Sequence, residues 1–273
     1  MVPHQKEHPF MKILEDPMSF SCQEACALTI GFFDGVHRGH KKLLQRMRAL
    51  KEKGQKNALV TFKEHPSAFF FPEKKFSYLT DLSTRIALLE KEEIDLLFLF
   101  SFDEDLSKLS YQEFIHQIRK KFPFTHLVLG ENAFFGHNRL GRAENIAKLA
   151  SKLSFSVEYL PLEKEKKTIT STQIRSLIRQ GKLLEAEKLL GRPFGYFVEK
   201  STSFYLHPLF MTEFFLKDLV LPPQGTYSVF VKKNLSSALL QITNSRLLLI
   251  TEKKPEKPFS FYFQEDKQPG ITK

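Results

Sequence analysis

The chain has 273 residues but only two cysteines, no long apolar run and no dense cluster of carboxylates. Cys22 and Cys26 are spaced neither as a redox Cys-x-x-Cys motif nor as half of a zinc site, so we expect both to be reduced thiols. The longest unbroken apolar run, residues 96–100, is far shorter than the ~20 residues of a membrane span. Residues 1–9 lack the apolar core of a signal peptide. The sequence therefore predicts a cytoplasmic protein with no membrane partner and no metal site made of its own side chains.

The chain is basic, with a net charge of +10, but it has no arginine-rich arm, zinc-finger pattern or ribonucleoprotein motif. The lysines of 51–53 and 163–167 are interspersed with glutamates, which is typical of solvated surfaces rather than of a basic stripe. A basic surface can attract either nucleic acid or small polyanionic substrates. We expect small polyanionic substrates and no nucleic-acid partner.

Apolar segments alternate with amphipathic ones through the first two thirds of the chain. The segments that favour strands are residues 25–30, 58–62, 96–100, 126–130 and 157–160. We expect helices over 40–53, over about 82–93 with Ile86 and Leu89 inward, and after a capping box of Ser110 and Glu113. This alternation is typical of βαβ units with a parallel sheet covered on both faces. We therefore predict an α/β fold with a five-stranded, Rossmann-like, doubly wound parallel sheet, in which ligands bind beyond the carboxyl ends of the strands.

The residue pattern of the sequence changes after Gly191-Arg192-Pro193. Short β-rich runs follow, separated by proline, glycine and asparagine. We predict two domains, an α/β domain over residues 1–194 and a small β-barrel-like domain over residues 195–273.

The most informative segment is T-I-G-F-F-D-G-V-H-R-G-H, residues 29–40, which lies where an apolar strand turns into a helix. Glycines in such a turn let the backbone approach an anion closely, and the start of the following helix offers free N–H groups. His37 and His40 are three residues apart and would share one face of the first helical turn. The segment therefore predicts a phosphate-binding site with two imidazoles.

This segment resembles the H-x-G-H signature of the nucleotidylyltransferase superfamily and, more specifically, the N-terminal module of the bacterial FAD synthetases. Four more segments follow in the order that this family has them: T-F-K-E-H-P at 61–66, G-E-N-A-F-F-G at 130–136, I-T-S-T-Q-I-R at 169–175 and L-L-G-R-P-F at 189–194. Together they extend the resemblance over about residues 20 to 195. Glu64 stands where the family has proline, and Ala133 stands where it has an aromatic residue.

The resemblance implies an FMN adenylyltransferase, a nucleotidyltransferase that transfers AMP from ATP to FMN and releases FAD and pyrophosphate. It implies Mg²⁺ that enters with ATP and is held mainly by phosphates and water. The catalytic residues that it implies are His37, His40 and Arg175. The ATP-binding residues that it implies are Gly31, Phe32, Phe33, Asp34, Gly39, Asn132, Ser171 and Thr172. The FMN-binding residues that it implies are Phe62, His65, Pro66 and Phe135.

Several of these residues also have a structural explanation. Ser171 or Thr172 can cap a helix, and His65 with Pro66 can form a rigid turn. Asp34 can hold its own turn or support a metal or a histidine. Arg175 is unexpected in a first helical turn, where cations are disfavoured, and a bound anion would remove that conflict.

Bacterial FAD synthetases usually continue into a riboflavin kinase domain with a G-R-x-L-G-x-P-T-A-N segment. Residues 195–221 contain no such string, and only L-P-P-Q-G-T-Y at 221–227 is similar to that domain. We therefore predict a degenerate kinase-like domain. Two alternatives stay open, a bifunctional enzyme that retains riboflavin kinase activity and a catalytically silent nucleotide- or flavin-binding regulatory protein. The sequence makes no prediction of the oligomeric state.

Overall fold

The computed structural model describes residues 11–15, 21–22, 25–52, 54–161, 169–233, 236–243 and 246–264. The chain forms two compact units. The first contains Met1–Phe76 and Arg85–Ile169, and the second contains Ser77–Thr84 and Thr170–Lys273. The chain passes between them at three points, after residues 76, 84 and 169, and the second of these falls inside helix α3 (Leu82–Glu90). In the described ranges no helix is long and apolar enough to cross a membrane.

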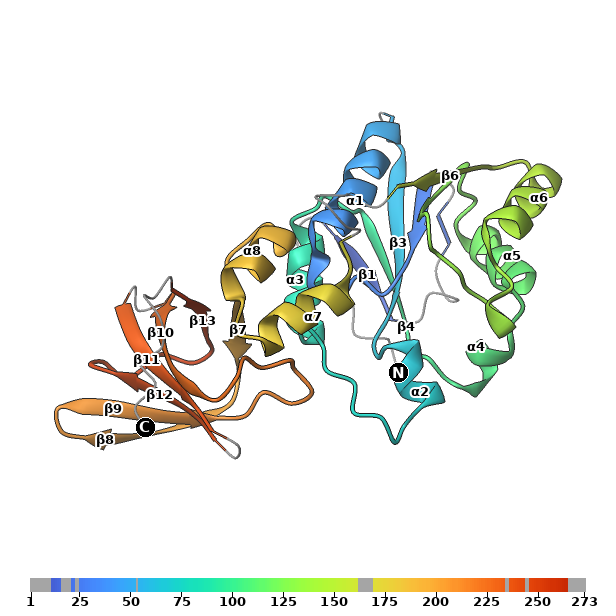
Figure 1. The fold of residues 1–273 in the computed structure, drawn as a ribbon. Helices are drawn as coiled ribbons and strands as arrows, with labels where there is room; N and C mark the ends of the chain where they lie inside the picture. The colour runs from blue at the N-terminus through green and yellow to red at the C-terminus, as the bar shows by residue number, and fades with distance from the viewer. Residues whose placement is uncertain are drawn as a thin grey trace, which may run out of the picture. The chain divides into compact units, whose positions relative to one another are not determined.

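The first unit contains a six-stranded parallel sheet in the order β1-β4-β3-β2-β5-β6 (Figure 1). The strands are β1 (Lys12–Leu14), β2 (Ala25–Ile30), β3 (Lys56–Phe62), β4 (Leu96–Phe100), β5 (His126–Gly130) and β6 (Ser156–Leu160). All five predicted strands are present, which confirms the Rossmann-like fold. The predicted number of strands was wrong, because β1 adds a sixth at the edge beside β4. A strand of three residues is too short to produce a periodic hydrophobic pattern.

The strand order reverses at β2, which pairs with β3 on one side and with β5 on the other. Both faces of the sheet are covered, since Leu28, Val60 and Leu97 are each fully buried. A crevice beyond the carboxyl ends of the strands is therefore expected next to the end of β2.

The other helices of this unit are α1 (Arg38–Leu50), α2 (Pro66–Phe70), α4 (Glu104–Lys108), α5 (Tyr111–Lys121) and α6 (Ala143–Leu153), with 3-10 turns η2 (Asp34–Val36) and η3 (His137–Arg139). Figure 1 shows α4, α5 and α6 grouped on one side of the unit. The predicted capping box is confirmed, because the Ser110 side chain accepts from the Glu113 amide while the Glu113 carboxylate accepts from the Ser110 amide. That carboxylate accepts two hydrogen bonds from Ser110, which lowers the pKa of Glu113.

Helix α3 differs from its prediction in one informative respect. It ends at Glu90, and the buried residues are Arg85 and Leu89, whereas Ile86 is only half-buried. Leu89 is buried as predicted, Ile86 is buried only in part, and the buried face of this helix also holds a charged side chain.

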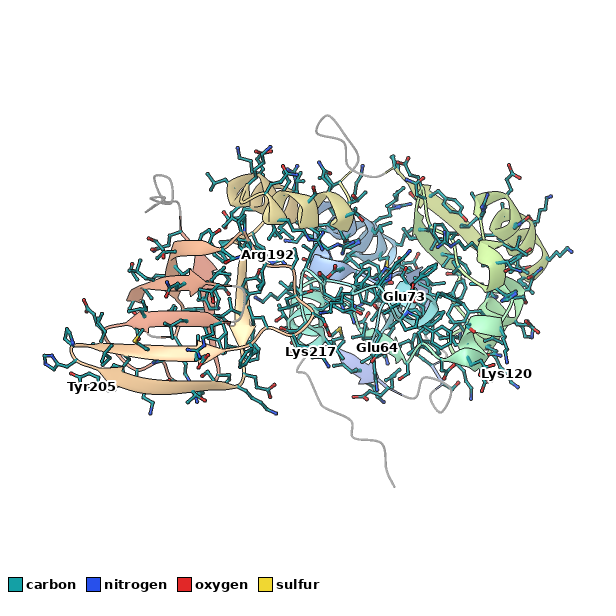
Figure 2. The ribbon with its side chains drawn as sticks, turned by 60° about the horizontal axis from the view of Figure 1, so that its bottom comes forward. Glu64, Glu73, Lys120, Arg192, Tyr205 and Lys217 are labelled. Carbon is teal, nitrogen blue, oxygen red and sulfur yellow. The ribbon has the colours of Figure 1, made fainter. Side chains whose placement is uncertain are left out.

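The second unit contains α7 (Ser171–Arg179), α8 (Leu183–Leu190) and a curled, seven-stranded antiparallel sheet. Its strand order is β7-β13-β10-β11-β12-β9-β8, with β7 (Gly195–Val198), β8 (Ser201–Leu206), β9 (Leu209–Phe214), β10 (Gly225–Val231), β11 (Ser236–Ile242), β12 (Leu247–Thr251) and β13 (Phe259–Phe263). In β12 and β13 every second residue is buried, as expected for strands with one face on a core. Tyr205 lies near the tip of the hairpin of β8 and β9 (Figure 2).

The antiparallel sheet agrees with the predicted small β-rich region. The predicted domain boundary between residues 194 and 195 stays a prediction. In the structure α7, α8 and residues 77–84 group with the antiparallel sheet, and Tyr78 forms a bridge with Leu219.

Candidate active site

The turn after β2 has an unusual backbone. Phe33, Gly35 and Val36 have positive φ angles of 58°, 75° and 38°. Positive φ is uncommon in residues other than glycine, and in a β-branched residue such as Val36 it is a genuine outlier. Strained backbone of this kind persists only where the surrounding structure imposes it, and it gathers at functional sites.

Two histidines lie at the start of α1, directly after this turn. The His37 and His40 rings are stacked, with centroids 3.7 Å apart and planes 19° apart. His37 is only 2 % exposed, and the Phe33 ring lies 4.9 Å from His40. Gly39 leaves room for the His37 ring, because a Cβ on Gly39 would lie only 3.2 Å from that ring. The predicted common face of the two histidines is thus confirmed by the stacking of their rings.

The electrostatics at His40 favour a neutral imidazole. Burial lowers the pKa of His40 well below its ordinary value, and the neighbouring His37 lowers it further. A neutral imidazole donates one hydrogen bond from one nitrogen without bringing a full charge into a buried site. A neutral His40 can therefore donate one hydrogen bond to a group at the helix start.

A cavity of about 720 Å³ opens beside this turn within the first unit. Seven of the predicted binding residues line it: Gly31, Phe32, Phe62, His65, Pro66, Asn132 and Phe135. The other lining residues come mainly from α2, from residues 102–114 and from the loop after β5, and they include Phe70, Phe71, Phe102, Phe114 and Phe134. Phe33, Asp34, His37, Gly39 and His40 do not line it. The site thus divides into an aromatic cavity and a histidine pair, joined by the adjacent residues Phe32 and Phe33.

His65 stands at the end of the cavity wall where α2 begins. Its Nδ1 accepts a hydrogen bond of 3.1 Å from the Ser67 amide, and Pro66 occupies the first helical turn. Its ring stacks on Phe76 at 4.3 Å and meets Phe32 edge-on at 4.7 Å. The same ring therefore caps α2 and lines the cavity.

The two departures from the family pattern differ in position. Glu64, labelled in Figure 2, is exposed and does not line the cavity. Ala133 lines it and lies against the apolar core. Phe135 packs on Phe114 at 6.1 Å, whereas Phe134 is 51 % exposed beneath the Arg139 guanidinium. The side chain at position 133 of the cavity wall is therefore smaller than in the family pattern, and the neighbouring phenylalanines supply aromatic surface there.

Two glycines hold the loop after β5 close to α5. A Cβ on Gly136, whose φ is +77°, would lie 2.5 Å from the Tyr111 amide nitrogen, and a Cβ on Gly141 would lie 2.5 Å from the Phe135 carbonyl oxygen. The loop also closes on itself through the bridge between Phe135 and Gly141. Only glycine permits this close approach.

Arg85 is the residue that sequence reasoning missed. Its side chain is 2 % exposed, and it donates hydrogen bonds to the carbonyl oxygens of Phe32, Phe62 and Lys63. Arg85 precedes the buried Leu89 by four residues, so the two share one face of α3. A charged residue on an apolar helix face is the signal that could have found it.

The remaining predicted residues lie in the second unit. Thr170, rather than Ser171 or Thr172, caps α7, because its side chain accepts from the Gln173 amide at 3.1 Å. The interpretation of Ser171 or Thr172 as the cap was therefore wrong. Arg175 donates to the Thr172 hydroxyl at 3.2 Å. The structure thus brings Thr172 and Arg175 together on one helix and brings His37 and His40 together in the other unit.

In a doubly wound parallel sheet, ligands bind beyond the carboxyl ends of the strands where the strand order reverses, and the histidine pair follows the strand at that point. Comparison with known proteins identifies the family. The family model described as FAD synthetase matches residues 19–173, which is more than half of the chain, and the chain belongs to this family.

Two relatives illustrate the range of the match. The chain is 33% identical over 176 residues to a bifunctional riboflavin kinase/FMN adenylyltransferase of Buchnera aphidicola, which covers 62% of this chain and 55% of the relative. It is 29% identical over 233 residues to an FAD synthetase of Listeria monocytogenes, with 82% and 86% covered. The chain spans about half the length of the bifunctional relatives that it matches.

A solved structure supports the fold over both units. A crystal structure titled as a macrolide-efflux protein from Streptococcus pneumoniae superposes with a TM-score of 0.80 at 22% sequence identity, covering 97% of this chain and 92% of that one. At this identity the likeness extends to the fold alone.

Proposed function

We propose that the chain is an FMN adenylyltransferase, which transfers AMP from ATP to FMN to give FAD and pyrophosphate. The observation that supports this most directly is the adjacency of Phe32 and Phe33. Phe32 lines an aromatic cavity, while Phe33 contacts the His37–His40 stack. A planar flavin suits an aromatic cavity, and phosphates suit helix-start amides with neutral imidazole donors.

The reaction needs little covalent chemistry from the protein. A phosphate oxygen of FMN attacks the α-phosphorus of ATP, a new P–O bond forms, and the bond to the leaving pyrophosphate breaks. Catalysis then consists of alignment and stabilisation of negative charge. His37 and His40 would donate hydrogen bonds to the phosphates, and Arg175 would neutralise charge from α7.

The binding residues follow the two parts of the site. Phe62, His65, Pro66 and Phe135 line the cavity and would contact FMN. Gly31, Phe32 and Asn132 would contact ATP, and because they line the cavity they also have access to a flavin. Phe33, Asp34 and Gly39 near the stack, and Ser171 and Thr172 on α7, would contact ATP. Mg²⁺ would enter with ATP and be held chiefly by its phosphates and by water.

We do not expect riboflavin kinase activity, because residues 195–221 lack the G-R-x-L-G-x-P-T-A-N segment. The silent flavin-binding protein remains the competing hypothesis. We expect the enzyme to act in the cytoplasm on ATP and FMN without nucleic acid or membrane.

The deciding experiment incubates the purified chain with ATP, Mg²⁺ and FMN and follows FAD and pyrophosphate by chromatography. A parallel incubation with riboflavin and ATP tests for FMN formation. We expect FAD in the first reaction and no FMN in the second. Binding of FMN without any FAD would favour the silent protein, and FMN formed from riboflavin would favour the bifunctional enzyme.

A further inference from the structure

Arg85 joins the two chain segments that form the inner wall of the cavity. Its Nη1 donates to the Phe32 carbonyl at 3.2 Å, at the end of β2. Its Nη2 donates to the Phe62 carbonyl at 2.6 Å and to the Lys63 carbonyl at 3.1 Å, at the end of β3. One guanidinium therefore fixes the distance between two neighbouring strand ends that both line the cavity.

The same guanidinium also lies on a ring of the cavity. Its central carbon is 4.0 Å from the centroid of the Phe32 ring. Phe32 in turn meets the His65 ring edge-on, and His65 stacks on Phe76. Arg85 is thus the buried end of a row of packed rings, of which Phe32 and His65 line the cavity.

We propose that Arg85 is a positioning residue for FMN, which sets the orientation of Phe32 and His65 and thereby the affinity of the cavity for the flavin. This inference rests on the proposed function. Arg85 does not line the cavity, so it acts through the residues that it holds. Its planar fork matches this task, because it donates to carbonyls in its own plane while its face covers a ring.

A purely structural role makes a different prediction, and Arg119 on α5 provides the matched control. Arg119 also donates to a backbone carbonyl, that of Phe124 at 2.7 Å, and also lies over two rings, 5.2 Å from Phe124 and 5.1 Å from Phe155. These contacts lie at the amino ends of β5 and β6, and none of the three residues lines the cavity. Replacement of Arg119 therefore measures how much such an arginine contact contributes to the stability of the protein at a place away from the cavity.

The test compares Arg85→Met, Arg85→Lys and Arg119→Met with the unmodified protein. For each we would measure kcat, the KM of FMN and of ATP, the Kd of FMN from quenching of flavin fluorescence, and the thermal midpoint. We expect Arg85→Met to raise the KM and Kd of FMN about tenfold or more, since small misplacements of binding groups have effects of this size. The KM of ATP should change less than about threefold. Arg85→Lys should raise the KM and Kd of FMN less than Arg85→Met does, because an ammonium group can donate to the carbonyls but cannot cover the ring.

Arg119→Met should lower the thermal midpoint and leave the FMN constants unchanged. The inference is overturned if Arg85→Met retains normal FMN constants, or if it changes the constants of FMN and ATP equally. Should Arg85→Met fail to fold, the FMN constants of Arg85→Lys decide: an increase for FMN alone supports the inference, and normal values overturn it. An unmodified protein that neither forms FAD nor binds FMN contradicts the proposed function itself, whereas FAD formation with normal FMN constants in Arg85→Met contradicts only this inference.

Discussion

The strands of the parallel sheet all begin on one side of it, called here the amino edge, and end on the opposite side, the carboxyl edge. The two differ in how their polar groups and backbone are arranged. At the amino edge, Lys51 pairs with Asp95 at 2.6 Å, and the Asn57 amide donates to the same carboxylate at 2.8 Å. The Asn57 side chain donates to the Met47 carbonyl at 2.7 Å. These contacts tie α1, β3 and the turn before β4 together, so this edge stabilises the fold.

At the carboxyl edge the backbone takes unfavourable conformations next to a cavity. Positive φ angles occur at Phe33 and Val36 after β2, and at Asn138 and Arg139 after β5. The cavity and the histidine stack lie at this edge. Positive φ angles also occur at the amino edge, at Glu93 and Ser154, but those of the carboxyl edge include the β-branched Val36 and lie in loops next to the cavity.

The largest expected effect is on catalysis at the carboxyl edge. His40→Ala should lower the rate of FAD formation by about 100-fold or more, by analogy with the loss of one donor to a developing oxyanion. Arg175→Ala should have an effect of similar size for the same reason. FAD is measured by chromatography, and a normal circular dichroism spectrum confirms folding. A turnover close to that of the unmodified protein in either variant would show that the replaced residue is not part of the active site.

A pair of glycine substitutions compares the two edges directly. Gly136→Ala, at the cavity, should lower the free energy of unfolding by about 2–4 kcal/mol, because the new Cβ meets the backbone of Tyr111 and the φ is positive. Gly54→Ala, between α1 and β3, has a φ of +85° but no atom within 4 Å of the new Cβ, so it should cost only about 1 kcal/mol.

The same pair should separate stability from flavin binding. Denaturant unfolding and FMN titration would be measured on both variants. We expect weaker FMN binding, by about tenfold, in Gly136→Ala alone. Equal effects of the two variants on FMN would show that the loop after β5 does not shape the cavity.

The histidine stack should make stability depend on pH. The pKa of His40 in the folded protein lies well below its ordinary value of 6.5, so below pH 6.5 the unfolded chain takes up a proton that the folded protein refuses. The free energy of unfolding should therefore fall as pH decreases below 6.5, by up to about 1.4 kcal/mol per pH unit. His40→Gln should show a shallower slope in denaturant titrations between pH 7 and 5. Identical slopes would contradict the lowered pKa.

The smallest expected effect is at the amino edge. Asp95→Asn removes a partly exposed ion pair with Lys51 and should lower the free energy of unfolding by about 1 kcal/mol or less. FAD formation should stay within about twofold of the unmodified rate. A large loss of activity would show that the amino edge does more than stabilise the fold.

Local patterns in the sequence were sufficient to predict much of this structure. The five longer strands follow from their apolar runs, and the capping box of Ser110 and Glu113 follows from its spacing. The common face of His37 and His40 follows from their spacing at a helix start, and the structure adds that their rings stack. In each case the determining residues lie within a few positions of one another.

Contacts between distant segments could not be predicted in this way. Arg85 bonds to carbonyls that lie 53, 23 and 22 residues earlier in the chain, and no short pattern specifies such partners. β1 is defined only by its pairing with β4. The cavity takes its walls from several separate segments, so its volume and lining became known only from the fold.

The most direct test of the account is a crystal structure of the protein with FMN bound. We expect the isoalloxazine ring in the aromatic cavity between Phe32, Phe62 and His65, with the FMN phosphate directed toward the stack of His37 and His40. A flavin bound to the antiparallel sheet, with the aromatic cavity empty at saturating FMN, would contradict the account.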